Sequence, residues 1–216
     1  LARRDFTVNA MAVRLPSLEF VDPFRGTDDL EKRVLRTPGS PEDSFDDDPL
    51  RMLRAARFAS QLELSVAEPV LEAIAAMADR LAIVSSERVR DELSKLLLSP
   101  RPRHGLAIVV DSGLAEVFLP ELPALRLEVD EHHRHKDVYE HTLTVVEQAI
   151  DLEPDGPDLV LRLAALLHDI GKPATRRFEP GGGVSCHHHE LVGARMSRKR
   201  LKALRYPKEV VDAVSG

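Results

Sequence analysis

The stretch Asp47-Asp48-Pro49-Leu50-Arg51-Met52-Leu53-Arg54-Ala55-Ala56-Arg57-Phe58 decides how this chain folds. Its apolar residues recur at steps of three and four, which is the spacing of one buried helix face. Pro49 stands where a first helical residue is favoured, and Asp48 stands where a helix cap is favoured. The stretch therefore predicts a helix that begins at Pro49.

Three arginines form a basic stripe on this predicted helix. Arg51, Arg54 and Arg57 follow one another at steps of three, so they span an arc of about 120° on one side. The stripe could pair with the acidic segment 42–48 before it, or simply be solvated. It could equally meet phosphates or bases. Spacing alone leaves these interpretations open.

Outward from this helix, the composition of the 216 residues favours a helical, cytoplasmic protein. Hydrophobic residues make up 43% and aromatic residues only 4%, so Leu, Val, Ala and Ile must build the core, which favours helices. The single cysteine cannot form an internal disulfide, and neither a signal peptide nor an apolar run long enough to span a membrane is visible. We therefore expect a cytoplasmic location and no membrane partner.

Charge is distributed unevenly along the chain. The net charge of −6 argues against a uniformly basic nucleic-acid binder. Between Arg195 and Lys208, however, there are seven basic residues and no acidic one. That run is either a solvated helix face or a surface that contacts phosphates.

Periodicity changes along the chain from strand-like to helical. Alternation of apolar and polar residues from Phe6 to Ala12, and apolar residues near Phe20, predict short strands and turns in residues 1–36. Beyond the helix at Pro49, helical spacing predicts further helices over about 71–81, 85–98, 106–110, 138–152, 158–170 and 190–204, with a glycine turn at 181–183. The Pro- and charge-rich stretch 120–136 marks a boundary, and its histidines (His132, His133 and His135) read as exposed linker.

Four motifs, in this order, resemble one enzyme family. They are Arg3-Arg4-Asp5-Phe6-Thr7-Val8-Asn9-Ala10-Met11-Ala12; Asp22-Pro23-Phe24 with Gly26 and Asp29-Leu30; the stretch from Asp47 to Phe58; and Ser86-Glu87-Arg88 with Glu92-Leu93. Together they are similar to the bacterial CCA-adding tRNA nucleotidyltransferases and poly(A) polymerases of class II. The similarity covers nearly the first hundred residues, and Asp47 stands where the family usually has Glu.

The resemblance implies a base-reading pair at Asp48 and Arg51. Cytosine and adenine both present an exocyclic amino donor beside a ring-nitrogen acceptor, whereas uracil and guanine reverse this pattern. A carboxylate beside a guanidinium would therefore accept C and A, with roughly 1–3 kcal/mol of discrimination per base. The resemblance further implies nucleotide-binding roles for Arg4, Asp5 and Asn9, which would link head and neck, and for Arg54 and Arg57, which would meet triphosphate or RNA.

The carboxylates that would catalyse the transfer are not among these motifs. The family uses two carboxylates on a strand of its head to hold Mg²⁺, which activates the RNA 3′-hydroxyl and stabilises the leaving pyrophosphate. No Gly-Ser followed by a strand with Asp-x-Asp occurs in the 216 residues. We therefore expect no catalytic residue in this chain, the Mg²⁺-binding carboxylates upstream of Leu1, and a chain that is a fragment of a longer enzyme.

A second resemblance lies in the last third of the chain. His168-Asp169 ends an apolar stretch, and His141 lies on the preceding predicted helix. The pattern resembles an HD phosphohydrolase domain, which implies that His141, His168 and Asp169 hold a divalent metal and that His189 is an accessory histidine. The family also needs a later carboxylate, for which Asp212 is too close.

Two other interpretations of these histidines stay open. They could be satisfied by hydrogen bonds in a retained fold whose metal site is degenerate or empty. A zinc site formed by Cys186 with the histidines at 187–189 is disfavoured, because adjacent histidines cannot all turn to one ion.

The sequence thus predicts a mainly α-helical chain in three parts. These are the end of a nucleotidyltransferase head with short strands (1–36), a helical nucleotide- and RNA-binding neck (37–125) and an all-α HD domain (130–216) truncated at its C-terminus. The predicted function is addition of C and A, or of A alone, to the 3′ end of tRNA or RNA from CTP and ATP. The alternative is a metal-dependent HD phosphohydrolase with an RNA-binding neck.

Overall fold

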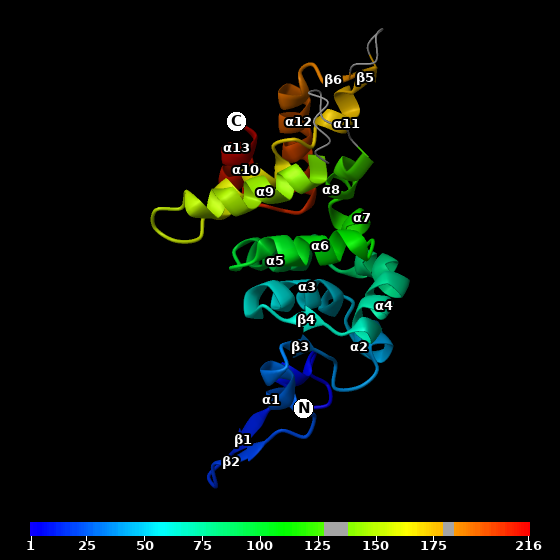
Figure 1. The fold of residues 1–216 in the computed structure, drawn as a ribbon, viewed down its shortest axis with the longest axis vertical. Coiled ribbons are helices and arrows are strands. Elements are labelled where there is room, and N and C mark those ends of the chain that lie inside the picture. Colours follow the sequence, from blue (N-terminus) through cyan, green and yellow to red (C-terminus); the bar gives the residue numbers. More distant parts are fainter. Residues whose placement is uncertain (128–137, 179–183) are drawn as a thin grey trace.

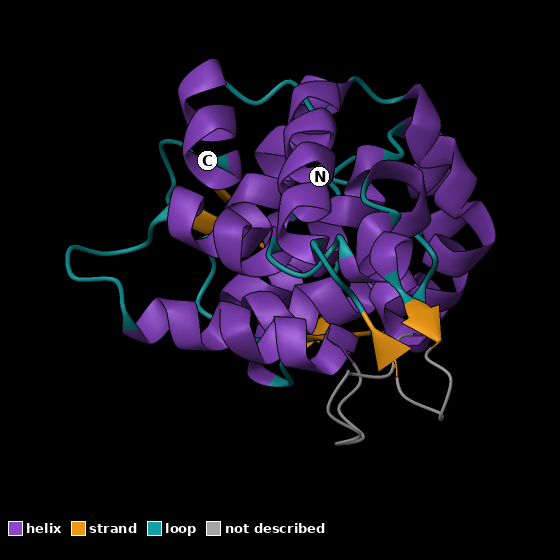
Figure 2. Cartoon of the chain, turned by 90° about the horizontal axis from the view of Figure 1, so that it is seen from above, coloured by secondary structure: helices purple, strands orange, loops and turns teal. Residues whose placement is uncertain are grey.

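The computed structural model is an elongated stack of helices and describes residues 1–127, 138–178 and 184–216. Figure 1 shows the chain climbing the stack once, with the N-terminus near one end and the C-terminus near the other. Seen from above, helices fill most of the outline and the strands are short (Figure 2). The prediction of a mainly α-helical chain is confirmed. The glycine turn predicted at 181–183 and the histidines at 132, 133 and 135 lie outside the described residues.

The first part of the chain holds short strands and a small helix. Its elements are η1 (Thr7–Asn9, a 3-10 helix), β1 (Ala12–Arg14), β2 (Glu19–Val21), α1 (Gly26–Glu31) and β3 (Val34–Leu35). β1 pairs with β2 in an antiparallel hairpin, with Val13 opposite Phe20. β3 pairs in parallel with β4 (Ser65–Val66), so the first part is hydrogen-bonded to the helical middle.

The predicted strand from Phe6 to Ala12 is wrong over most of its length. Asp5 Oδ1 accepts a hydrogen bond from the Phe6 amide, and the Ala10 amide donates to the Thr7 carbonyl, which closes a 3-10 turn. Phe6, Val8 and Ala10 are nevertheless buried, which explains the alternation in the sequence. Thr7 is buried as well, because its hydroxyl donates to Asp29 Oδ2 at 2.6 Å.

The middle of the chain is a helical body centred on α3. Its elements after β3 are α2 (Pro41–Asp47), α3 (Leu50–Leu62), β4, α4 (Glu68–Met77), η2 (Ala78–Ile83, a 3-10 helix), α5 (Ser86–Leu97), α6 (Pro102–Asp111), α7 (Ala115–Phe118), α8 (Glu121–Ala124) and η3 (Leu125–Leu127, a 3-10 helix). α3 packs closely on α6, where the Gly105 amide donates to Ser60 Oγ at 2.7 Å. A Cβ at Gly105 would lie 2.6 Å from the Ala56 carbonyl oxygen, so only glycine fits this contact.

Two features of this body differ from the sequence prediction. The acidic segment forms a helix of its own, α2, whose first turn contains Pro41 and whose cap is the Ser40 hydroxyl, which accepts from the Asp43 amide. The helix predicted over 71–81 begins earlier, at Glu68, and tightens to 3-10 geometry at Ala78. The helices predicted at Pro49 and Ser85 are present as α3 and α5.

The last part is helical apart from one short hairpin. Its elements are α9 (Val138–Asp151), α10 (Leu159–Leu167), α11 (Lys172–Thr175), β5 (Arg177–Phe178), β6 (Val184–Ser185), α12 (His189–Ala203) and α13 (Lys208–Ser215). α10 ends three residues earlier than predicted, because the chain turns at His168–Ile170 toward α11. α13 was not predicted.

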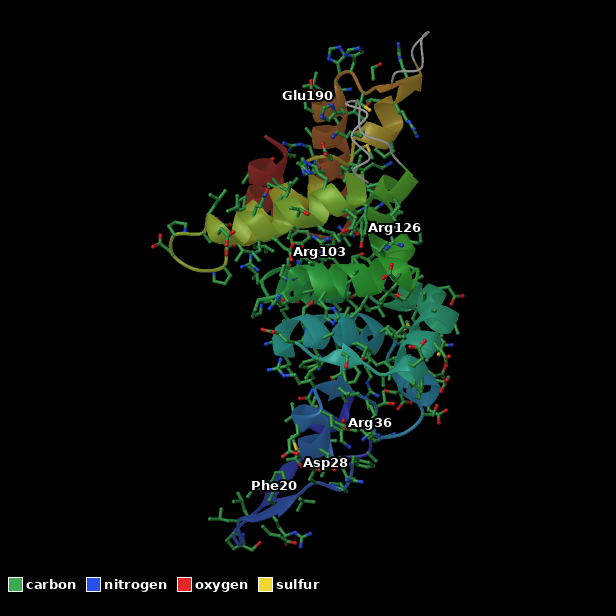
Figure 3. All side chains as sticks on the ribbon, in the orientation of Figure 1. Phe20, Asp28, Arg36, Arg103, Arg126 and Glu190 are labelled. Atoms are coloured by element: carbon green, nitrogen blue, oxygen red, sulfur yellow. The ribbon has the colours of Figure 1, made fainter. Side chains whose placement is uncertain are left out.

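One continuous apolar core joins the middle and last parts, because it includes residues from Phe6 to Val211. At the junction, buried Arg162 of α10 donates from Nη1 to the carbonyl oxygens of Leu97 (2.5 Å) and Ser99 (2.8 Å), and it pairs with buried Glu153. Arg103 of α6 forms ion pairs with Glu140 and Glu147 of α9 (Figure 3). The two parts are therefore packed together rather than linked only by the chain.

In the described residues, no helix is both long and apolar enough to cross a lipid bilayer.

Candidate functional site

A pocket of about 210 Å³ lies between the N-terminal turn and the start of α3. It is lined by Arg3, Arg4, Asp5, Asp48, Arg51 and Arg54. Five of the seven residues predicted to bind nucleotide are among these six. The pocket combines four guanidinium groups with two carboxylates, which gives it an excess of positive charge suited to a triphosphate.

Asp48 occupies the corner between α2 and α3, and both of its oxygens have partners. Oδ1 accepts from the Leu50 amide at 3.2 Å, as the predicted helix cap requires, and Oδ2 accepts from Arg88 Nη2 at 2.8 Å. The Asp48 side chain is 29% exposed. A ligand amino group could therefore reach Oδ2 only by sharing it with Arg88 or by displacing Arg88.

Arg51 is fixed from two sides at the start of α3. Its Nη1 donates to Ser44 Oγ at 2.9 Å, and its Nη2 donates to the Arg3 carbonyl oxygen at 2.9 Å. The guanidinium thus connects α2, α3 and the N-terminal turn. Its contacts with α2 go to Ser44 rather than to a carboxylate of the acidic segment.

Buried Asp5 and half-buried Arg54 form a bonded pair in the lining of the pocket. Arg54 donates to Asp5 Oδ2 from Nε (2.9 Å) and Nη2 (2.6 Å), while Asn9 Nδ2 donates to Asp5 Oδ1 at 3.1 Å. Burial raises the pKa of the Asp5 carboxyl, but the hydrogen bonds from Arg54 and Asn9 outweigh burial and hold that pKa below its usual value. Asp5 is therefore ionised at neutral pH, and Asn9 acts on the pocket through Asp5.

Arg57 lies outside the pocket, in the interior of the helical body. Its Nε donates to Glu92 Oε2 at 2.6 Å and its Nη1 donates to Gln61 Oε1 at 2.7 Å. Its guanidinium carbon also stands 3.9 Å from the centre of the Phe58 ring. Arg57 is only 8% exposed, and both of its hydrogen bonds join it to the helical body. Its nucleotide-binding role stays a prediction.

Sequence reasoning missed three residues that hold this pocket. Arg88 bonds to Asp48, Glu92 pairs with both Arg54 and Arg57, and Ser44 orients Arg51. Arg88 and Glu92 belong to a recognised motif, so the signal was present without an assigned role. Ser44 carried no signal in the sequence.

A second cluster of polar side chains lies where α9 meets the end of α10. His141 comes from α9, and His168 and Asp169 follow α10 directly. One ligand atom from each of the three lies within 4.8 Å of the others. Asp169 Oδ2 stands 3.1 Å from His168 Nε2 and 4.0 Å from His141 Nε2. The three residues predicted to hold a metal are thus brought together.

Backbone contacts orient the histidines of this cluster. His168 Nδ1 lies 2.8 Å from the Ala165 carbonyl oxygen, and His189 Nδ1 lies 2.9 Å from the Cys186 carbonyl oxygen. A carbonyl can only accept, so both rings carry a proton on Nδ1 and turn Nε2 toward Asp169. His189 Nε2 is 3.8 Å from Asp169 Oδ1. This arrangement is typical of histidines that ligate a metal through Nε2.

Asp169 is the buried anion at the centre of this cluster. Burial raises its pKa, but contacts with His168 and Lys172 outweigh burial and lower the pKa of the carboxyl to about 2. Burial also lowers the pKa of His168, and the bond to Asp169 reverses this and raises it above its usual value. Lys172 Nζ stands 2.9 Å from Asp169 Oδ2 and supplies a positive charge there. Two imidazole nitrogens and a carboxylate oxygen fit a divalent metal, with Lys172 as the group that would give way.

A close backbone contact brings His189 to Asp169. A Cβ at Gly171 would lie 2.1 Å from the His189 carbonyl oxygen and 2.6 Å from the Gly193 amide nitrogen. The first turn of α12 can therefore approach the turn after Asp169 only because residue 171 is glycine.

The zinc interpretation of Cys186 and the histidines at 187–189 gains no support from the described residues. The described residues that could share one metal ion form the single group His141, His168 and Asp169, without Cys186, His187 or His188. Asp212 accepts from Arg198 Nη1 at 2.7 Å.

Three family models match this chain along most of its length. The poly(A) polymerase head domain matches residues 1–36, the probable RNA and SrmB-binding site of polymerase A matches residues 63–125, and the HD domain matches residues 138–216. These matches run in the same order as the three predicted parts.

Curated relatives and solved structures agree with these models. The A-adding tRNA nucleotidyltransferase of Deinococcus radiodurans is 42% identical in an alignment of 213 residues that covers 96% of this chain and 48% of that protein. The CC-adding tRNA nucleotidyltransferase of Thermus thermophilus is 40% identical over 225 residues, covering 100% of this chain and 50% of that protein. The crystal structure of the Bacillus stearothermophilus CCA-adding enzyme in complex with CTP has a TM-score of 0.63 at 29% identity, and covers 98% of this chain and 43% of that one.

This chain spans about half the length of the curated relatives it matches. The similarity to these relatives nevertheless covers nearly all of this chain. On these findings, the chain belongs to the bacterial tRNA nucleotidyltransferase and poly(A) polymerase family, with an HD domain after the helical body.

Proposed function

We propose that this protein adds C and A, or A alone, to the 3′ end of tRNA or RNA from CTP and ATP. In this proposal Asp48 and Arg51 select the incoming base. The observation that carries the proposal is the pocket, because it brings Asp48, Arg51 and Arg54 together with Arg4 and Asp5, which lie more than 40 residues earlier in the sequence. The relatives named above support the same reaction class.

Selection would follow from the opposite hydrogen-bonding characters of Asp48 and Arg51. Asp48 can only accept, so it suits the exocyclic amino group of cytosine or adenine. Arg51 can only donate, so it suits the adjacent ring nitrogen. Uracil and guanine would set a carbonyl oxygen against the carboxylate and leave an N–H facing the guanidinium, which costs free energy on both sides. Ser44 and the Arg3 carbonyl oxygen hold Arg51 in one orientation before a base arrives.

Binding of a base would require a local exchange at Asp48. Arg88 now donates to Asp48 Oδ2, and the Arg88 side chain is 53% exposed, so it can leave toward solvent. Arg3 and Arg4 line the same pocket and would meet the triphosphate there. The base would thus replace Arg88 at Asp48, while the phosphates bind Arg3 and Arg4.

The carboxylates of the pocket do not fit a Mg²⁺ site. Asp5 is bonded to Arg54 and Asp48 to Arg88, and the two carboxylates serve the arginines that shape the pocket. We therefore assign Mg²⁺ binding to neither of these two carboxylates.

The direct test uses the protein expressed from its own start codon. It is incubated with tRNA lacking its 3′-terminal CCA, and with tRNA ending in CC, together with labelled CTP or ATP. We expect incorporation of C and A into the first substrate, or of A alone into the second. Absence of incorporation of either nucleotide into both substrates would refute the proposal.

A second candidate function belongs to the histidine cluster. His141, His168 and Asp169 offer two nitrogens and one oxygen within 4.8 Å of one another, which favours metal-dependent hydrolysis of phosphate esters, including 2′,3′-cyclic phosphates and nucleotides. A divalent metal bound there would supply Lewis-acid activation of water at neutral pH. The residues of this chain would hold the metal and, through His189, keep a further imidazole beside Asp169.

Metal binding and hydrolysis are measured separately for this candidate. Calorimetric titration with Mn²⁺ should show one site in the chain and none in Asp169→Ala, while Asp212→Ala, which removes a carboxylate bonded to Arg198, should retain it. Phosphate release from a 2′,3′-cyclic nucleotide should follow the same pattern. Hydrolysis that survives in Asp169→Ala would assign the activity to another site.

A further inference from the structure

The helix α12 carries a stripe of three exposed cations. Arg195, Lys199 and Lys202 lie at steps of four and three, within an arc of about 60° on one face of the helix. All three side chains are exposed. The stripe belongs to the basic run from Arg195 to Lys208, whose role the sequence left open.

The carboxylates that approach this run are committed to other cations. Asp212 of α13 bonds to Arg198 at 2.7 Å, and Glu121 of α8 forms a two-pronged pair with Arg200. Within the described ranges 1–127, 138–178 and 184–216, Arg195, Lys199 and Lys202 form no ion pair. Three positive charges therefore face solvent in one row, in a chain whose net charge is −6.

A cavity of about 600 Å³ continues the stripe at the N-terminal end of α12. Its lining includes Arg177, His187, His188 and Val192. Val192 lies three residues before Arg195, on the same face of the helix, so the cavity and the stripe adjoin. Figure 1 shows α11 and α12 side by side at this end of the stack. His188 lines the cavity, and the next residue, His189, faces Asp169.

We propose that the α12 stripe and this cavity bind the backbone of single-stranded RNA. Cations three and four residues apart on a helix lie about 5–6 Å from one another, so each can meet a separate phosphate of an extended strand. Exposed imidazoles at His187 and His188, and Leu191 at 56% exposure one turn before Arg195, offer surfaces on which bases can stack or pack. The choice of RNA over another polyanion rests on the proposed function.

The stripe would give the HD domain an RNA contact of its own. The matched RNA-binding region covers residues 63–125 and ends well before α12. A strand that follows the stripe toward the N-terminus of α12 arrives at the cavity, one residue along the chain from His189. The surface would therefore lead RNA toward the histidine cluster.

The test compares two triple variants of the 216-residue chain that lose the same charge. One is Arg195→Gln/Lys199→Gln/Lys202→Gln, and the control is Arg14→Gln/Arg25→Gln/Lys32→Gln, whose members are exposed near the opposite end of the stack. Fluorescence anisotropy measures binding of a labelled 12-nucleotide RNA between 50 and 200 mM KCl. Circular dichroism and thermal unfolding verify that both variants are folded, as expected for exposed positions.

We expect the stripe variant to bind the RNA roughly tenfold or more weakly at 50 mM KCl, with a salt slope less steep by about 2, since each contact with a single strand contributes about 0.7. The control variant should match the unmodified chain. Equal affinity and equal salt slope for the two variants would overturn the proposal. Competition by polyglutamate as effective as by unlabelled RNA would also overturn it, because the surface would then recognise charge alone.

The result of the RNA-binding test does not depend on whether the protein adds nucleotides. Failure of the full-length protein to incorporate C or A would refute the proposed function, whereas the two triple variants would still differ in RNA binding if the stripe is a contact surface. If the two triple variants differed in incorporation of C or A but bound RNA equally, the RNA-binding proposal for the stripe would be refuted and the proposed function would stand.

Discussion

Arg54 donates two hydrogen bonds, from Nε and Nη2, to the same carboxylate oxygen of Asp5, which lies 49 residues earlier in the sequence. This pair joins the N-terminal turn to the second turn of α3. It therefore links the two sides of the pocket, since Asp48 and Arg51 stand on one side and Arg3 and Arg4 on the other.

Removing this carboxylate should destabilise the fold in a pH-dependent manner. Asp5→Asn loses a buried charge-assisted pair, and we expect the free energy of unfolding to fall by about 1.5–3 kcal/mol at pH 7. Because the folded-state pKa of Asp5 is lowered, the stabilisation is fully present above the unfolded-state pKa of about 3.9 and is lost as the pH falls through the lower folded-state pKa.

Urea unfolding between pH 7 and pH 2 tests this expectation. The difference between the unmodified chain and Asp5→Asn should be constant down to about pH 4 and should shrink below it. Asp28→Asn, which removes a carboxylate from the surface pair with Arg25, is the control and should cost less than about 1 kcal/mol. A difference that does not change with pH would contradict the assignment.

The base-selecting role of Asp48 predicts a loss of selectivity. Asp48→Asn presents a donor as well as an acceptor, so uracil and guanine would no longer face a carboxylate, and the preference for C and A should fall by about 1–3 kcal/mol. The measurement is competition among the four nucleoside triphosphates for incorporation by the full-length protein. Asp46→Asn is the matched control, because Asp46 is 66% exposed and pairs with Arg80. If both variants keep the original preference, Asp48 does not read the base.

The close backbone contact at Gly171 predicts that adding a single methyl group there destabilises the fold. Gly171→Ala would set Cβ against the backbone of His189 and Gly193, so we expect a loss of about 1–3 kcal/mol of stability and weaker metal binding by the histidine cluster. Gly39→Ala adds the same methyl group where nothing lies within 4 Å, and it should be nearly neutral. Thermal unfolding and Mn²⁺ titration of both variants make the comparison. Equal behaviour of the two would show that the contact is not required.

Buried Arg162 should contribute far more to the stability of the fold than Arg103, which lies at the solvent-facing edge of the same junction. Arg162→Ala leaves the Glu153 carboxylate and the carbonyl oxygens of Leu97 and Ser99 without their buried donor, so a loss of about 3–5 kcal/mol is expected. Arg103→Ala removes ion pairs that face solvent and should cost about 1 kcal/mol or less. Chemical unfolding measures both, and similar losses would contradict the central place of Arg162.

The sequence predicted best those features that depend on neighbouring residues or on a recognised motif. Asp48 Oδ1 accepts from the Leu50 amide at the start of α3, as its position before Pro49 predicts, because such a bond needs only an amide two residues away. The motifs also identified five of the six residues that line the pocket and the three residues of the histidine cluster, although they could not give the distances between them.

Long-range partners explain what the sequence could not predict. Asp5 turns the residues after it into η1 by bonding the Phe6 amide, while its other oxygen receives Arg54 from α3. Arg57 resembled its neighbours Arg51 and Arg54 in spacing, but Glu92, 35 residues later, draws it into the interior. Periodicity contains no information about such partners, since they are set by tertiary packing.

The contacts of Arg162 give the HD domain a structural role that does not depend on any reaction at its histidine cluster. This side chain donates to the carbonyl oxygens of Leu97, the last residue of α5, and of Ser99 just beyond it, and one apolar core passes through the junction. The HD domain therefore packs against the end of the helical body. A variant without His141 or His168 would lose part of the histidine cluster and keep these contacts with the helical body. Selection for stability alone would therefore favour keeping the HD fold, whatever becomes of the cluster.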